Sequence, residues 1–182
     1  MKLRIILFAL ISFPFLWSCD KKEIPVFASD DAGIYFQRLT NAVYGSTTEY
    51  YGDSTDFSFA GTNAYYTSHV LYAPVLTMGK VVDYDRPFKV VVDMETTAVE
   101  GKDFEIELDS LVIKAGTSKA EVPVRIIRTE TLLEKTLKIV LRLQENEHFK
   151  CYLETYKNTN LYTAKGEQIS GVRYVFTFNE MY

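Results

Sequence analysis

The sequence predicts an all-β protein, an antiparallel immunoglobulin-like β-sandwich of about seven strands. Three observations predict it. Apolar and polar residues alternate with a period of two in several segments, and glycine, asparagine and aspartate separate these segments as turns. Aromatic residues, which favour strands, make up 14% of the 182 residues, with 13 Tyr and 12 Phe. The irregular stretches 40–54 and 148–171 have no convincing pattern of an amphipathic helix.

The first half of the chain is expected to contribute four strands. Gly33–Arg38, Thr55–Phe59 and Tyr65–Met78 are rich in the aromatic and branched side chains that fit a pleated sheet. The fourth is FKVVVDM, in which one face carries an apolar set: Phe88, Val90, Val92 and Met94. Because successive side chains of a strand point to opposite faces, we expect this set to lie in the core.

The second half is expected to contribute the other strands, beginning with Ser110–Lys114. Three later segments show the alternation clearly, with these residues on the apolar face: Val122, Val124 and Ile126; then Leu137, Ile139, Leu141 and Leu143; then Tyr174, Phe176 and Phe178. Pro123 has no amide hydrogen to donate, so its strand is expected to lie at a sheet edge or to carry a bulge.

The N-terminus has the pattern of a secreted lipoprotein, and the chain divides into a signal peptide (1–18), a tether (19–31) and a sandwich domain (32–182). Lys2 and Arg4 precede the apolar run Ile5–Trp17, which is shorter than the roughly 20 residues of a membrane-spanning helix. The run ends at Cys19 in a sequence that resembles a lipobox, which implies that Cys19 is lipidated on its thiol and becomes the new N-terminus after cleavage. The alternative is a plain signal peptide with an incidental cysteine. We predict an outer-membrane lipoprotein of the cell envelope and leave open which face it occupies.

Composition and motifs argue against several classes of function. The formal net charge is −4, and the processed chain would carry −6, so the basic surface that a nucleic-acid binder needs is lacking. The sequence contains no HExxH, no phosphate-binding glycine loop, no GxSxG and no CxxC. His69 and His148 are its two histidines, and neither stands in the spacing of a catalytic triad or a metal site. We therefore predict a non-catalytic protein that uses no cofactor.

Aromatic residues are the first candidates for binding. They gather in the first half of the chain, at Tyr44, Tyr50, Tyr51, Phe57, Phe59, Tyr65, Tyr66 and Tyr72. Exposed tyrosines stack well on sugar rings or protein partners, but aromatic residues of strands usually lie in the core. The loop that carries Tyr44, Tyr50 and Tyr51 is our candidate contact for a ligand or partner. In the DYDRPF block, Arg86 is expected to pair with a neighbouring carboxylate.

The segment Phe88–Leu143 resembles a Calx-beta repeat. The strand FKVVVDM is followed by TTAVEGKDFE, by LVIKAGTSKAEVPVRIIR and by LEKTLKIVLRL, in the order of that family. The positions that characterise its turns are filled by Ala98, Gly101, Asp103, Phe104, Ala115 and Gly116. The resemblance implies the same sandwich fold.

It also implies a candidate calcium site, since Ca²⁺ takes about six to eight oxygen ligands. The weak candidates are Asp83, Asp85, Glu100 and Asp103. However, Arg128-Thr129-Glu130 stands where calcium-binding members carry two aspartates, and a guanidinium group would repel the cation. We therefore expect no metal, and we expect Asp103 to stabilise its turn by accepting hydrogen bonds from the backbone.

Taken whole, the chain resembles a lipoprotein family of Bacteroidetes that is of unknown function. The shared features are the lipobox, the strand Gly33–Phe36, the DYDRPF block and the Calx-beta-like core. Its members often accompany Sus-type systems of nutrient uptake. The resemblance implies a lipid-anchored binding or assembly module, accessory to glycan or peptide uptake, with an envelope protein or an oligosaccharide as partner. The alternative is a Calx-beta-like module for adhesion or calcium response.

Overall fold

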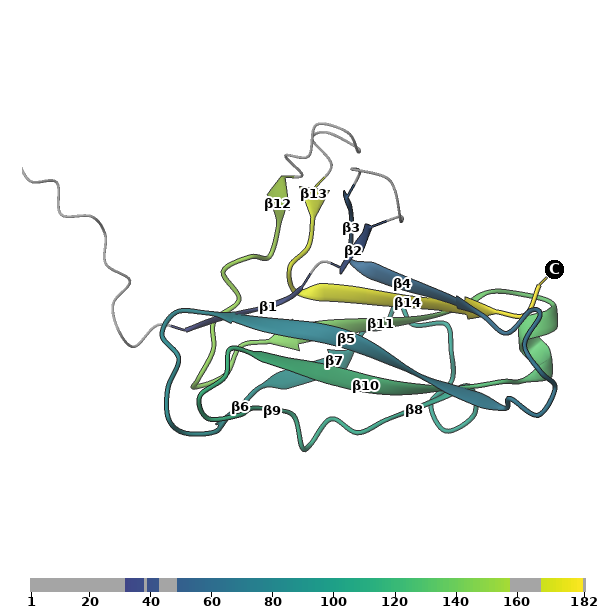
Figure 1. Ribbon diagram of the computed structural model, residues 1–182, viewed down its shortest axis with the longest axis horizontal. Helices are drawn as coiled ribbons and strands as arrows, with labels where there is room; N and C mark the ends of the chain where they lie inside the picture. Colours follow the sequence, from purple (N-terminus) through teal and green to yellow (C-terminus); the bar gives the residue numbers. More distant parts are fainter. Residues whose placement is uncertain (1–31, 38, 43–48, 158–167, 182) are drawn as a thin grey trace, which may run out of the picture.

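The computed structural model describes residues 32–37, 39–42, 49–157 and 168–181, and these form two packed β-sheets (Figure 1). One sheet has the order β1 (Gly33–Phe36), β5 (Ser68–Met78), β10 (Lys119–Ile127), β8 (Phe104–Ile106). The other has the order β4 (Ser54–Ser58), β14 (Arg173–Asn179), β11 (Leu137–Gln144), β7 (Lys89–Val92). The prediction of an all-β sandwich is confirmed.

The strand order is that of the immunoglobulin fold, in which strands A, B, E and D form one sheet and C, F and G form the other. Taken in chain order, β5, β7, β8, β10, β11 and β14 occupy the places of B to G. The first strand of that fold is divided here, so that β1 joins one sheet and β4 joins the other. As a result β4 runs parallel to β14, whereas every other pair of strands in the two sheets is antiparallel.

Short strand pairs and a short helix accompany the two main sheets. β2 (Leu39–Ala42) pairs with β3 (Glu49–Gly52), and β12 (Tyr156–Lys157) pairs with β13 (Gln168–Ile169). Both pairs extend from the side of the sandwich where β4 and β14 lie (Figure 1). β6 (Arg86–Pro87) pairs with β9 (Val112–Ile113), and the short 3-10 helix η2 (Glu130–Leu133) precedes β11. Within the described ranges, no helix is long and apolar enough to span a membrane.

The core is built from the alternating sets that the sequence predicts, with one exception. Val90, Val122, Val124, Ile126 and the apolar sets of β11 and β14 are all buried. Met94 is instead 100% exposed, so its placement in the core was wrong. The reason is that β7 ends at Val92, and the amide of Glu95 donates to Asp93 Oδ1 (3.0 Å) in a turn that reverses the alternation.

A buried aspartate holds the turn before β8. Asp103 Oδ2 accepts a hydrogen bond from the amide of Val99 (2.9 Å), and its Oδ1 accepts one from Thr129 Oγ1 (3.2 Å). Its backbone carbonyl accepts from the amide of Ile127 on β10 (2.9 Å). Gly101 occupies the left-handed backbone region at φ +78°, which a side chain would strain. The predicted role of Asp103 in stabilising this turn is confirmed.

An ion pair fastens the end of β14 to the end of β10. Arg128 Nε donates to Glu180 Oε2 (2.8 Å), and Nη2 donates to Oε1 in the same bidentate pair. Arg128 Nη1 also donates to the carbonyl of Asn63 (3.0 Å), which brings in the loop between β4 and β5. The hydrogen bonds from Arg128 hold the pKa of the Glu180 carboxyl below its ordinary value of 4.5. The basic residue expected to exclude calcium therefore serves as a structural clamp.

Replacing Asp103 with alanine should lower the free energy of unfolding by about 1–3 kcal/mol, because it leaves buried donors without an acceptor. Denaturant unfolding of Asp103→Ala and of the wild type measures this loss. The matched control is Asp109→Ala at an exposed aspartate, which should change stability by less than about 0.5 kcal/mol. Equal losses in the two variants would contradict the role assigned to Asp103.

The Glu180 clamp should make stability depend on pH. Because the folded-state pKa of Glu180 is lowered, its contribution is present in full above the unfolded pKa and is lost as pH falls through the folded pKa. The stability advantage of the wild type over Glu180→Gln should therefore be largest near neutral pH and shrink below about pH 4.5. Denaturant unfolding across the acid range measures this difference, and an advantage that stays constant with pH would refute the clamp.

Candidate functional site

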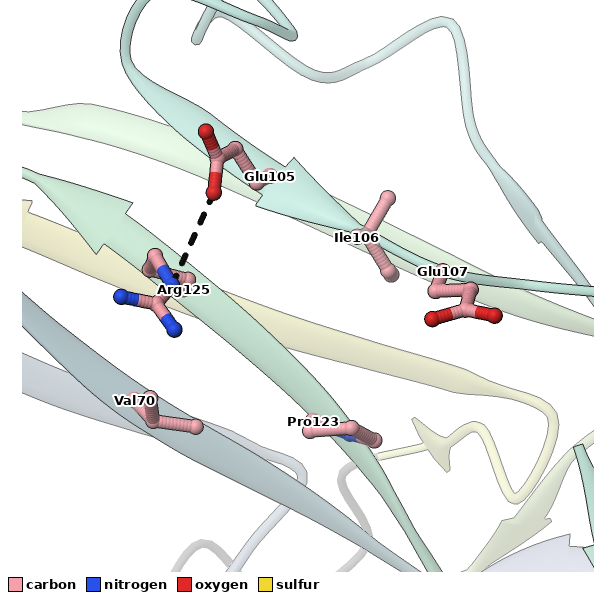
Figure 2. A pocket seen from close by; sticks show the side chains of 6 residues that line it. All are labelled: Val70, Glu105, Ile106, Glu107, Pro123 and Arg125. Carbon is pink, nitrogen blue, oxygen red and sulfur yellow. Dashed lines mark ion pairs between the residues drawn. The ribbon is translucent and has the colours of Figure 1, made fainter. Parts of the chain in front are cut away.

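A hollow of about 300 Å³ lies on the outer face of the sheet that contains β5, β10 and β8 (Figure 2). Its lining comes from these three strands and from the residue after β8: Val70, Glu105, Ile106, Glu107, Pro123 and Arg125. Arg125 lies opposite Val70 on one side and opposite Glu105 on the other. The hollow is thus centred on β10, between its two neighbouring strands.

A proline explains why the sheet opens at this place. The amide of Ile127 donates to Asp103, so the backbone groups of Ile127, and of every second residue before it, point towards β8. Pro123 has the same parity but carries no N–H. Pairing between β10 and β8 ends at Val124 with Ile106, the pair just before Pro123 would be reached. β8 then separates from β10 and leaves the hollow between them.

This arrangement corrects one prediction about Pro123. The strand β10 is central, between β5 and β8, whereas the sequence predicts an edge or a bulge. The physical reason is that the edge is local. Pro123 still has Tyr72 as its partner on β5, but on the other side it lies just past the last residue pair of β8.

The hollow carries charge of both signs. Arg125 Nε lies 3.6 Å from Glu105 Oε2, and both side chains are more than half exposed. Glu107 stands apart from this pair at the other end of the hollow (Figure 2). Because exposed ion pairs contribute only about 0–1 kcal/mol, a ligand can replace this one at low cost. The hollow therefore offers a hydrogen-bond donor and two carboxylates to a polar ligand.

An apolar surface adjoins these charges. Tyr72, which is 51% exposed, is the partner of Pro123 in the register between β5 and β10, and its side chain points to the same outer face. Val70 and Pro74 share this face of β5, two residues to either side of Tyr72. Together with the hollow they form a surface that combines a tyrosine ring, proline rings and charged groups. We call it the β5–β10 face.

Two of the three predicted tyrosine contacts lie on strands away from the hollow. Tyr44 falls outside the described residues, as does Cys19. Tyr50 and Tyr51 belong to β3, where they pair with Asn41 and Thr40, and their side chains lie outside the described part of the structure. The β2–β3 pair adjoins β4 and β14, so it belongs to the other sheet's side of the sandwich (Figure 1). The assignment of these three tyrosines stays a prediction.

Of the remaining aromatic candidates, the phenylalanines lie in or against the core, whereas the tyrosines are exposed. Phe59 is buried and Phe57 packs against the core. Tyr65, Tyr66 and Tyr72 are exposed, and Tyr66 Oη lies 2.6 Å from His69 Nδ1. Tyr72 is therefore the aromatic residue that joins the hollow. Sequence reasoning missed this site because its residues come from three segments. The alternation identified their outward direction but could not show that β8 separates from β10.

The four candidate calcium ligands are not gathered by the fold. Asp85 accepts hydrogen bonds from Lys114 Nζ (2.8 Å) and from the amide of Ala115 (2.8 Å), which lower the pKa of its carboxyl. Asp103 is buried in its turn, while Asp83 and Glu100 are exposed on separate loops. No cluster of three or more His, Cys, Asp or Glu residues that could hold a metal ion is found within residues 32–37, 39–42, 49–157 and 168–181.

Arg86 does not form the predicted ion pair. Lys114 is the partner of Asp85, and across the described ranges Arg86 has no carboxylate within ion-pair distance. Its side chain turns inward instead, and its guanidinium carbon lies 4.7 Å from the centre of the Phe149 ring. The sequence suggested that Arg86 pairs with a neighbouring aspartate. In the structure, Asp85 pairs instead with Lys114, which follows β9.

Fold and surface thus define an immunoglobulin-like β-sandwich with an open, amphipathic sheet face. The chain belongs to the family described as "Domain of unknown function (DUF4843)", whose model matches residues 30–168. The predicted membership in a family of unknown function is confirmed, while its lipoprotein, Calx-beta and nutrient-uptake features stay predictions. No curated protein sequence matches this chain.

Among solved structures, the chain is similar to one from Bacteroides ovatus ATCC 8483 that is described as a "putative carbohydrate binding protein". The TM-score is 0.46 and the sequence identity is 10%. The alignment covers 82% of this chain but only 37% of the other, so this chain spans little more than a third of that protein's length.

Proposed function

We propose that this protein is a non-catalytic binding module that takes an oligosaccharide on the β5–β10 face. The observation that carries the proposal is the hollow lined by Arg125, Glu105 and Glu107, together with the exposed Tyr72, which is the register partner of the lining residue Pro123. A protein partner on the cell envelope is the alternative occupant of the same face.

A sugar ring matches both parts of this surface. Its C–H groups form an apolar face that packs on a tyrosine or proline ring, which Tyr72 and Pro123 supply. Its hydroxyl groups both donate and accept, so Glu107 would accept from one and Arg125 would donate to another. Because the hollow is open rather than enclosed, a polymer can lie along the face and extend beyond it at both ends. This geometry suits the capture of a chain.

The place of the protein is proposed from the sequence. Lipidation of Cys19 would anchor the domain in the outer membrane, since each buried methylene of an acyl chain contributes about 0.8 kcal/mol. The tether 19–31 would connect the anchor with β1, which begins at Gly33. Such a module would hold a glycan or a peptide close to an uptake system of the envelope.

Replacing Tyr72 with alanine should weaken binding to the preferred glycan by roughly tenfold, the equivalent of about 1.4 kcal/mol of lost stacking. A glycan array identifies the ligand, and calorimetric titration measures its affinity. Tyr84→Ala removes a tyrosine of similar exposure from the loop before β6, away from this face, and should leave affinity unchanged. Equal affinities of the two variants, or no bound glycan at all, would reject the sugar site and favour an envelope protein.

Replacing Cys19 with alanine should leave an unprocessed precursor and remove the acylated form from the membrane fraction. Metabolic labelling with a fatty acid, followed by membrane fractionation, measures both effects. Cys151→Ala is the matched control, since Cys151 is the other cysteine of the chain and should not affect processing. Normal maturation of Cys19→Ala would show that the cysteine is incidental to the signal peptide.

A further inference from the structure

Arg86 is buried without the partners that its charge requires. The residue is 4% exposed, and its Nε and Nη2 have no hydrogen-bond partner in the described structure. Leaving a buried ionised group without an ion pair costs several kcal/mol, because the charge loses its hydration and no opposite charge replaces it. The ring of Phe149 covers one face of the guanidinium but cannot accept hydrogen bonds at its edge.

The surrounding residues hold Arg86 in this position. β6 pairs with β9, so the backbone of Arg86 lies opposite that of the buried Ile113. Asn146 Nδ2 donates to the carbonyl of Pro87 (2.8 Å), and Asn146 Oδ1 accepts from the amide of Phe149 (2.9 Å). This asparagine therefore fixes the Phe149 loop to the strand that carries Arg86. These contacts fix the backbone of Arg86 and the position of the Phe149 ring that lies against its guanidinium.

The acids on neighbouring segments are already engaged. Asp85 is turned towards Lys114 and Ala115, as described above. Glu145 Oε1 accepts from the amide of Cys151 (2.9 Å), and its Oε2 lies 3.5 Å from Lys150 Nζ. Both carboxyl groups have a lowered pKa for this reason, which keeps them ionised for their own partners. Neither of them compensates Arg86.

We propose that Arg86 is the anchor of a binding site for a carboxylate, which accepts two hydrogen bonds from Nε and Nη2. These two nitrogens form the side edge of the guanidinium fork, whose spacing matches the two oxygens of a carboxylate. A water molecule would satisfy one donor but would leave the positive charge uncompensated. This site lies at β6 and Phe149, apart from the β5–β10 face, and the inference does not depend on the proposed glycan binding.

The test compares the wild type with Arg86→Met, a replacement that fills similar space without charge. Thermal melting is followed as sodium acetate replaces sodium chloride at constant ionic strength. If the carboxylate comes from solution, acetate should raise the wild-type melting temperature progressively, since a ligand of the folded state stabilises it, and Arg86→Met should not respond. Lys102→Met, which removes an exposed positive charge from a turn outside both sites, should keep the wild-type response to acetate.

If the carboxylate belongs to the chain itself, acetate should have no effect but Arg86→Met should be less stable than the wild type. That loss should disappear when pH falls below the range in which carboxylates ionise, near pH 4 for an ordinary acid (about 3.9–4.3). Either result supports a carboxylate on Arg86 and identifies its source. If Arg86→Met is as stable as the wild type or more stable in every buffer, the inference is overturned, because an unpaired buried cation gains from apolar replacement.

Discussion

The antiparallel pairing of β5 with β10 is the constraint on which the rest of the structure depends. It joins the nine residues of β10 to β5 without interruption, and it sets which side chains of both strands face the core. Val122, Val124 and Ile126 point inward, so Pro123 and Arg125 must point outward. Because the side-chain period is two, a slip of one residue would exchange these sets and bury the charge. The register between β5 and β10 therefore determines both which side chains form the core and which form the β5–β10 face.

Two prolines end the pairing of the outer strands with this central pair. Pro123 follows the last residue pair between β10 and β8, and Pro74 follows the last pair between β5 and β1, which joins Val75 to Phe36. The carbonyl of Pro74 still accepts from the amide of Gln37 (2.8 Å), so the backbone groups of Pro74 point towards β1. Each central strand thus tolerates its proline, because the proline lacks a backbone N–H only at the position where the shorter neighbouring strand has already ended. One of these two endings creates the hollow.

The fold could be predicted from the sequence because alternation is a local signal, and residues such as Ile139 and Phe176 show it without knowledge of their partners. Met94 was misplaced because the alternation does not show where a strand stops. The hollow and the environment of Arg86 depend on distant segments. Lys114, 29 positions after Asp85, forms the ion pair with Asp85 that the sequence suggested for Arg86. Phe149, which lies against the Arg86 guanidinium, is still further along the chain. Sequence neighbours suggested an ion pair, but tertiary structure supplied a different partner.

The two outer faces of the sandwich differ in a way that bears on function. On the β14–β11 side, Val140 and Val175 face outward yet are buried. The chain after β7 continues beside them, with the amide of Asp93 donating to the carbonyl of Val140, and Arg142–Asp93 and Arg173–Glu95 ion pairs flank them. The β5–β10 face has apolar side chains of its own, but Tyr72 and Pro123 stay exposed beside a loose ion pair. The charged network thus covers one apolar face, while the other stays open, and the open one is the face on which we propose that an oligosaccharide binds.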